Sequence, residues 1–136
     1  MLGEAISAAL PELRAQAESM MADTVLVERA NGGVTTDPVT LEETPTYDTV
    51  HTGPGRVQRP GTQPSETVAG EVEFGVSLVY VQLPLSVTGI RRNDRVTVMA
   101  LGPDSDPDLL GLVATVQANL TKSHPTKRTL VCEEVT

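Results

Sequence analysis

Aromatic side chains are almost absent from this chain. Its 136 residues contain no Trp, one Phe (Phe74) and two Tyr (Tyr47 and Tyr80). A chain of this length hides roughly two thirds of its unfolded surface on folding, so a sizeable core is possible, but aliphatic residues must fill it. Proteins that hold nucleic acid use aromatic stacking platforms and phosphate-neutralising cations. The scarcity of aromatic residues therefore argues against a nucleic-acid-binding barrel.

Cysteine is limited to Cys132, so no internal disulfide can form and a reducing site of synthesis is expected. The two histidines, His51 and His124, do not stand with Cys132 at any metal-ligand spacing. Each is expected to be an ordinary surface or core histidine. The sequence thus predicts no metal from these residues.

The run Asp104-Ser105-Asp106-Pro107-Asp108 resembles the opening of a calcium-binding loop. However, Leu109 stands where such a loop needs glycine, and Thr115 stands where it needs a bidentate glutamate. We therefore expect an Asp/Pro turn at this position, and no metal or other cofactor.

Motifs for catalysis are missing as well. There is no G-x-S-x-G nucleophile motif, and Gly53–Arg56 lacks the spacing of a phosphate-binding loop. Glu133 and Glu134 are adjacent, so on a strand they face opposite ways and cannot act as a catalytic pair. The expectation is that the protein is not an enzyme.

Long apolar runs are also missing. No stretch approaches the roughly 20 apolar residues that span a bilayer. The first ten residues carry Glu4, no basic region and only a short apolar run, which is not typical of a secretory signal. A soluble protein made in the cytoplasm, without a membrane partner, is expected.

The charge is acidic and uneven. The formal net charge is −8, and residues 1–50 hold nine of the 18 acidic side chains but only Arg14 and Arg29 of the ten basic ones. Acidity of this kind serves solubility in most proteins. A more specific interpretation is a surface that DNA must pass without sticking.

An amphipathic helix is predicted over residues 1–22, because apolar residues recur there at spacings of three and four. Pro11 either kinks this helix or begins a second one. We expect the helix to cover an open end of the barrel or to dock on a neighbouring subunit. The apolar positions are Leu2, Ile6, Leu10, Leu13, Ala17 and Met20 or Met21.

The stretch 77–101 predicts strand, turn and strand. Its first strand is apolar on both faces up to Pro84, which has no N–H to donate, and a polar turn at 91–94 precedes a second strand of period two. Residues 23–136 are expected to form one domain, a small antiparallel β-barrel or sandwich. Its predicted strands are Thr24–Glu28, Tyr47–Val57, Val68–Leu83, Arg95–Leu101, Leu110–Ala118 and Thr129–Val135.

Three further segments are predicted to be turns, bulges or loops. Asn31-Gly32 is typical of a tight type I′ hairpin, and Gly53-Pro54-Gly55 predicts a break or bulge in the second strand. Between the second and third strands we expect a long, exposed, mobile loop, because the segment has no apolar residue to bury. That loop comprises Gln58, Arg59, Pro60, Gly61, Thr62, Gln63, Pro64 and Ser65.

Four segments, in this order and spacing, resemble the head-to-tail stopper (head-closure) proteins of long-tailed bacteriophages, notably those that infect actinobacteria. They are AESMMADTVLVER (17–29), TVHTGPGRVQ (49–58), the stretch from 77 through GPDSDPDLLGLVATV (102–116) and TKSHPTKRTLVCEEV (121–135). The similarity covers most of the chain and rests on collinearity. Family members often have cysteine or a charged residue where this chain has Gly55.

The resemblance implies a structural virion protein, assembled in the host cytoplasm and located at the head–tail interface. Copies of the chain would form a ring below the portal and adaptor rings, with the tail terminator or tail tube proteins on the other side. In such proteins the loop between the second and third strands projects into the channel and retains packaged DNA. Its position here corresponds to Gln58–Ser65.

A channel wall lined with carboxylates would repel DNA, which carries about one negative charge per 1.7 Å of axis. That repulsion acts within a Debye length of about 8 Å at physiological salt, so DNA would slide and closure would be steric. Arg56 and Arg59 would be the residues nearest the DNA phosphates. Two alternatives remain: another phage joining protein, such as an adaptor or tail terminator, or a monomeric, non-catalytic, cytoplasmic ligand-binding β-barrel with a polar pocket.

Overall fold

The computed structural model describes residues 2–59, 77–123 and 125–135. One helix, α1 (Leu2–Ser19), precedes six strands. The strands are β1 (Asp23–Thr36), β2 (Glu43–Gln58), β3 (Leu78–Leu83), β4 (Arg95–Ala100), β5 (Val113–Leu120) and β6 (Arg128–Glu134), and a 3₁₀ turn, η1 (Pro107–Leu109), lies between β4 and β5. No helix in the described ranges is long and apolar enough to cross a membrane.

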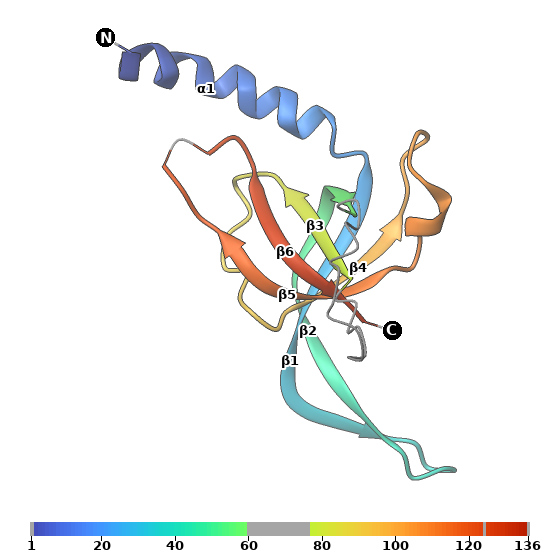
Figure 1. Cartoon of the computed structure of the whole chain (residues 1–136). Coiled ribbons are helices and arrows are strands. Elements are labelled where there is room, and N and C mark those ends of the chain that lie inside the picture. Colours follow the sequence, from blue (N-terminus) through green and yellow to red (C-terminus); the bar gives the residue numbers. More distant parts are fainter. Residues whose placement is uncertain (1, 60–76, 124, 136) are drawn as a thin grey trace, which may run out of the picture.

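The six strands form one antiparallel sheet that returns on itself in the order β1-β2-β3-β6-β5-β4 (Figure 1). The closure is uneven, because β2 pairs with β3 only through Arg56–Gln58, whereas β3 pairs with β6 along its whole length. The predicted fold class, a small antiparallel β-barrel with an N-terminal helix, is confirmed. The predicted start of the third strand at Val68 lies outside the described residues, and the described part begins at Leu78.

The barrel interior is aliphatic, as the composition predicted. Alternation within each strand sends one set of side chains inward, and those of β3 (Val79, Val81 and Leu83) are fully buried. Its outer face is less covered than predicted, since Leu78 and Tyr80 are partly exposed. The core comprises Val25, Val27, Val57, Val79, Val81, Leu83, Val87, Ile90, Val96, Val98, Leu112, Ala114, Val116, Leu130 and Cys132.

The prediction of a hairpin at Asn31-Gly32 is wrong. β1 runs straight through these residues to Thr36, and the register with β2 shifts between Ala30 and Val34. Gly32 has φ of 82°, and the Gly33 N–H donates to the Asn31 side-chain oxygen at 2.8 Å. Asn-Gly tolerates positive φ in a bulge as well as in a turn, so the local signal alone did not distinguish the two.

The hairpin turn lies further along, between Thr36 and Glu43. The Asp37 N–H donates to the Glu42 carbonyl at 2.9 Å and the Leu41 N–H to the Asp37 carbonyl at 2.8 Å. Because β1 pairs with β4 only as far as Glu28, the rest of the hairpin projects from the barrel as a two-stranded ribbon (Figure 1). We call residues 29–48 the arm.

The predicted break at Gly53-Pro54-Gly55 is also wrong. These residues pair with β1 in unbroken register, Val25 opposite Gly53 and Asp23 opposite Gly55. The bulge lies around Val50, beyond the Leu26–Thr52 and Val27–His51 pairs. The pairing of β2 with β3 begins only at Arg56, so on its second side Pro54 pairs with none of the described strands. A proline is tolerated at such an unpaired edge.

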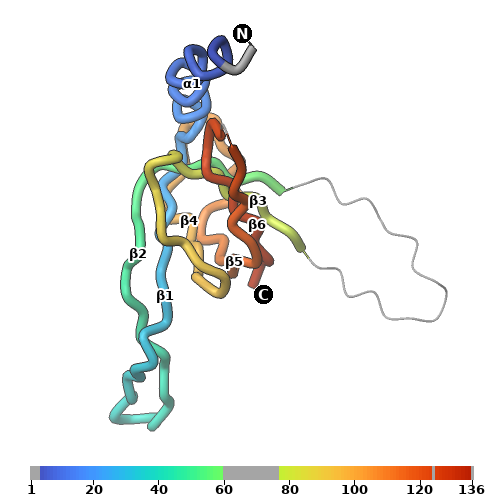
Figure 2. The backbone as a smooth tube through the Cα atoms, turned by 90° about the vertical axis from the view of Figure 1, so that its left-hand side faces the viewer, coloured from blue at the N-terminus to red at the C-terminus, as the bar shows by residue number. Residues whose placement is uncertain are grey.

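Helix α1 is a single helix that contains Pro11. It lies over the end of the barrel opposite to the arm (Figures 1 and 2). The Arg14 Nε–H donates to the Pro125 carbonyl at 3.0 Å, and Leu10 is buried. The helix therefore covers the barrel end, but lightly, because Ile6 and Leu13 of the same stripe are 41% and 43% exposed.

Candidate functional site at the base of segment 60–76

The predicted channel loop begins at the end of β2, and the structure describes its first two residues. Gln58 is the last residue of β2, pairs with Tyr80 and accepts a hydrogen bond from the Gln82 side-chain amide at 3.3 Å. Gln58 therefore belongs to the sheet, contrary to the prediction. Arg59 follows the strand. The remaining candidates, Pro60, Gly61, Thr62, Gln63, Pro64 and Ser65, lie outside the described residues.

One carboxylate joins the two ends of segment 60–76. Arg59 Nη2 lies 2.9 Å from Glu134 Oε1, and the Ser77 hydroxyl donates to Glu134 Oε2 at 3.0 Å. The Glu134 N–H also donates to the Ser77 carbonyl at 2.9 Å, which fixes the backbone of β6 beside the start of β3. Both chain ends of the segment are thus held at one place on the rim of the barrel.

Sequence reasoning missed Glu134. The expectation that Glu133 and Glu134 face opposite ways agrees with their partners, since Glu133 accepts from the Gln117 side chain at 3.4 Å. The contact of Glu134 with Arg59 depends on the β3–β6 register and spans 75 positions in sequence. No local pattern reports such a register.

Arg56 lies on a surface groove beside this base. The groove has a volume of 490 Å³ and runs between the end of β2 and the segment that follows β4; Met20, Asp104 and Asp106 also line it. The guanidinium Nη1 lies 3.8 Å from Met20 Sδ. A neighbouring groove is lined by Arg59, Asp106 and Asp108. The two predicted DNA-proximal arginines therefore sit among carboxylates and do not form an isolated basic patch.

The segment that carries these aspartates is fixed by Asp23. This buried carboxylate accepts from the Gly102 N–H at 2.9 Å and from the Ser105 hydroxyl. Asp106 caps η1 by accepting from the Asp108 N–H at 3.0 Å. The predicted Asp/Pro turn is therefore present, and within the described ranges no cluster of three or more His, Cys, Asp or Glu side chains is placed to hold a metal.

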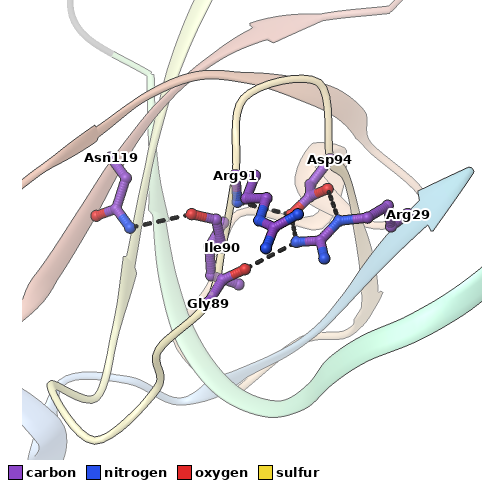
Figure 3. Close-up of polar contacts among 6 residues, drawn as sticks. All are labelled: Arg29, Gly89, Ile90, Arg91, Asp94 and Asn119. Carbon is purple, nitrogen blue, oxygen red and sulfur yellow. Dashed lines mark hydrogen bonds and ion pairs between the residues drawn. The ribbon is translucent and has the colours of Figure 1, made fainter.

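At the root of the arm, a second buried carboxylate joins β1 to the β3–β4 connection (Figure 3). Asp94 accepts from Arg29 Nε and Nη2, both at 2.9 Å, and from the Arg91 N–H at 2.8 Å. Arg29 Nη2 also donates to the Gly89 carbonyl at 2.8 Å. Hydrogen bonding to Asp94 raises the pKa of Arg29 above its usual value. The arrangement locks the β3–β4 connection onto the base of the arm.

A thiol and an imidazole lie outside these two clusters. Burial raises the pKa of the Cys132 thiol to about 12, so it stays protonated at neutral pH and is a poor nucleophile. His51 Nε2 is buried without a hydrogen-bond partner, and it faces no nucleophile among its described contacts. His124 is not described.

The geometry defines a class: a small antiparallel barrel with a filled interior, a helix over one end and a projecting β-arm at the other. The chain belongs to a family described as "Family of unknown function (DUF6093)", which matches residues 13–133. No curated protein matches it. It is similar to the solution structure of protein SF1141 from Shigella flexneri 2a, with a TM-score of 0.54 and 18% identity over 85% of this chain and 93% of that one. At this identity the likeness concerns the fold alone.

Proposed function

We propose that the protein is a structural subunit of the bacteriophage head–tail connector, forming a stopper ring below the portal and adaptor rings. The observation that carries the proposal is the arm. At its tip Val39 and Leu41 are 87% and 73% exposed. Exposed apolar side chains on a projecting element are available for contact with another protein, and the proposal assigns the tip that role.

The helix supports the same conclusion from the opposite end. Ile6, Leu13 and Met20 are all exposed by more than 40%. An isolated two-stranded ribbon and a lightly docked helix bury too little apolar surface to be stabilised by themselves. In a ring, contacts with neighbouring subunits would stabilise both the arm and the helix.

The charges around the base of segment 60–76 fit a channel that DNA passes without being held. Arg56 and Arg59 face the aspartates of residues 104–108, and Arg59 is paired with Glu134. Their positive charge is therefore offset locally, which weakens attraction to phosphates. The proposed partner is DNA that slides through, with no sequence-specific contact.

A ligand-binding barrel is the alternative from another class, and the barrel interior argues against it. Fifteen buried residues, all apolar or thiol-bearing, fill the space between the described strands. A ligand barrel needs an interior cavity with a few convergent polar groups. The described grooves instead lie on the surface, between loops or beside α1.

Reconstitution tests the proposal. The purified full-length chain is mixed with portal and adaptor rings, and the complex is measured by native mass spectrometry and electron microscopy. We expect a ring stacked on the adaptor, with a surface that then accepts the tail. Failure to join that complex would falsify the stopper proposal, and binding only to the tail side would favour a tail terminator instead.

A second experiment addresses the predicted channel loop. Because Gln58 and Arg59 belong to the sheet and its base, the deletion should cover only Pro60–Ser65. We expect heads that assemble but lose packaged DNA, whereas a deletion of Val39–Leu41 should prevent ring assembly. Heads that retain DNA normally would show that 60–65 is only a connection.

A further inference from the structure

Two surfaces at opposite ends of this protomer carry the inference. One is the arm tip, residues 34–45, which projects away from the barrel. The other is a groove between α1 and the turn after β3, which we call the helix groove. Its lining residues are Pro11, Arg14, Ala15, Glu18, Leu85 and Ser86.

The arm tip is acidic and apolar. Residues 34–45 contain Asp37, Glu42 and Glu43 and no basic residue. The same segment exposes Val39 and Leu41. Backbone N–H groups of Val39 and Thr40 donate to the Asp37 carboxylate at 2.8 and 3.4 Å, so the turn that presents these side chains is ordered. The tip is therefore a defined convex surface.

The helix groove is shallow and open to solvent, and two arginines lie at it. Its volume is 560 Å³, enough to seat an aliphatic side chain and its turn. Arg14 lines it, and Arg128 donates to the carbonyl of the lining residue Leu85 at 3.2 Å. Among the lining residues the single carboxylate is that of Glu18.

We propose that the arm tip of one copy of this chain docks in the helix groove of the next copy. The tip carries three carboxylates and two exposed apolar side chains, and Arg14 and Arg128 lie at the groove. These features favour this pairing over a tip-to-tip contact, in which the carboxylates of two tips would repel one another. The inference rests on the proposed function, since it names the contact between neighbours in the ring.

The position of the two surfaces sets the symmetry of the contact. The arm tip and α1 lie at opposite ends of the barrel in both views, so a chain cannot fill its own groove (Figures 1 and 2). A contact between two different surfaces is heterologous, and repeated it closes into a ring or continues as a filament. A two-fold dimer uses the same two surfaces only if each copy places its arm in the groove of the other.

Disulfide trapping tests the inference. Leu41→Cys and Ala15→Cys are made in separate full-length chains; both sites are exposed, and the native Cys132 is buried. The two variants are mixed, oxidised mildly and measured by mass spectrometry, both free in concentrated solution and in the connector complex. We expect a covalent 41–15 dimer from the mixture and none from either variant alone.

The matched control is Gln16→Cys, which is exposed on the same helix but points away from the groove side. It should give little crosslinking with Leu41→Cys. A 41–41 crosslink, or equal crosslinking at 15 and 16, or no 41–15 crosslink in either state would overturn the inference. If the chain joins the connector as a ring without the 41–15 crosslink, the proposed function stands and this contact fails.

Charge substitutions on the two surfaces give an independent test, because they should change the strength of assembly in opposite directions. Glu18→Lys removes the carboxylate of the groove and should strengthen assembly by up to about fivefold, because an exposed ion pair contributes little. Glu42→Lys should weaken assembly by a similar factor. Glu12→Lys, on the far side of α1, should leave it unchanged. Equal effects of Glu18→Lys and Glu12→Lys would indicate a net-charge effect and overturn the proposed pairing.

Discussion

Strands β1 and β2 run from the barrel into the arm, and their side chains meet very different surroundings in the two parts. In the first six residues of β1, buried and half-buried side chains alternate, whereas residues 30–36 are all exposed. The backbone pairing of β1 with β2 continues through both parts. Strand pairing alone therefore does not make a core, because a second layer of side chains must close over one face.

What holds the arm in place is polar and sits at its root. Arg29 is bound by Asp94, and the Arg95 guanidinium lies 3.7 Å from the centroid of the Tyr47 ring. In the barrel the corresponding task is done by fully buried aliphatic side chains. The barrel is therefore held by a shared core, whereas the distal half of the arm is held by its own strand pairing and turn hydrogen bonds.

The largest difference should appear when one leucine is truncated in each region. Leu130 is completely buried in β6, and Leu130→Ala should lower the free energy of unfolding by about 3 kcal/mol through lost burial and a cavity. Leu41→Ala at the arm tip should change it by less than about 0.5 kcal/mol. Urea unfolding of both variants measures this. Equal losses would mean that the tip packs on the barrel, contrary to the comparison.

Removing the Asp94 carboxylate at the root of the arm should have the next largest effect on the free energy of unfolding. Asp94→Ala leaves Arg29 and the Arg91 N–H without their partner, and we expect a loss of about 2 kcal/mol, because Arg29 can still reach water. Amide exchange should speed up at residues 89–94. The control Asp104→Ala, on an exposed turn, should stay within about 0.5 kcal/mol. An Asp94 variant as stable as that control would contradict the role of this contact.

The buried thiol should make the barrel sensitive to alkaline pH. Its pKa is about 12 in the folded state and lies near the ordinary value of 9.0 when unfolding exposes it. As pH rises, the thiol of the unfolded state therefore loses its proton before that of the folded state. The contribution of the buried thiol to the free energy of unfolding is full below about pH 9. It is lost as pH rises toward 12, at about 1.4 kcal/mol per pH unit. Urea unfolding of the parent chain and of Cys132→Ala between pH 8 and about 11 measures the slope. Identical slopes would contradict a buried, protonated thiol.

The smallest effect should be confined to the arm and to acid pH. Hydrogen bonds from the Val39 and Thr40 N–H groups lower the pKa of Asp37. Their contribution is present above the ordinary pKa of an aspartate and is lost as pH falls through the lowered value. Below that pH, amide exchange should speed up at residues 39–42 while the barrel amides stay protected. Asp37→Ala should show fast exchange at every pH, and acid-induced exchange spreading into β3 would contradict an independent arm.

Much of the barrel could be predicted from the sequence, because alternation of period two is local. Val79, Val81, Val96 and Val98 point inward as that alternation requires. Pro84 follows the last residue of β3, and a turn at 91–94 precedes β4. For the candidate site, the sequence predicted the place in the chain where the loop begins but not the contacts at its base. β2 ends at Gln58, next to the predicted end of the strand at Val57, but Glu134, which contacts both Arg59 and Ser77, comes from the last strand.

The sequence by itself determined an aliphatic antiparallel barrel, an amphipathic helix before it, an Asp/Pro turn and the acidity of the first fifty residues. Only the tertiary structure decided that Asn31-Gly32 is a bulge within a long arm, and that Asp94 binds Arg29 across 65 positions. Period and turn chemistry are properties of a few consecutive residues. Register and side-chain pairing depend on which strands meet, and the closing of the whole sheet sets that.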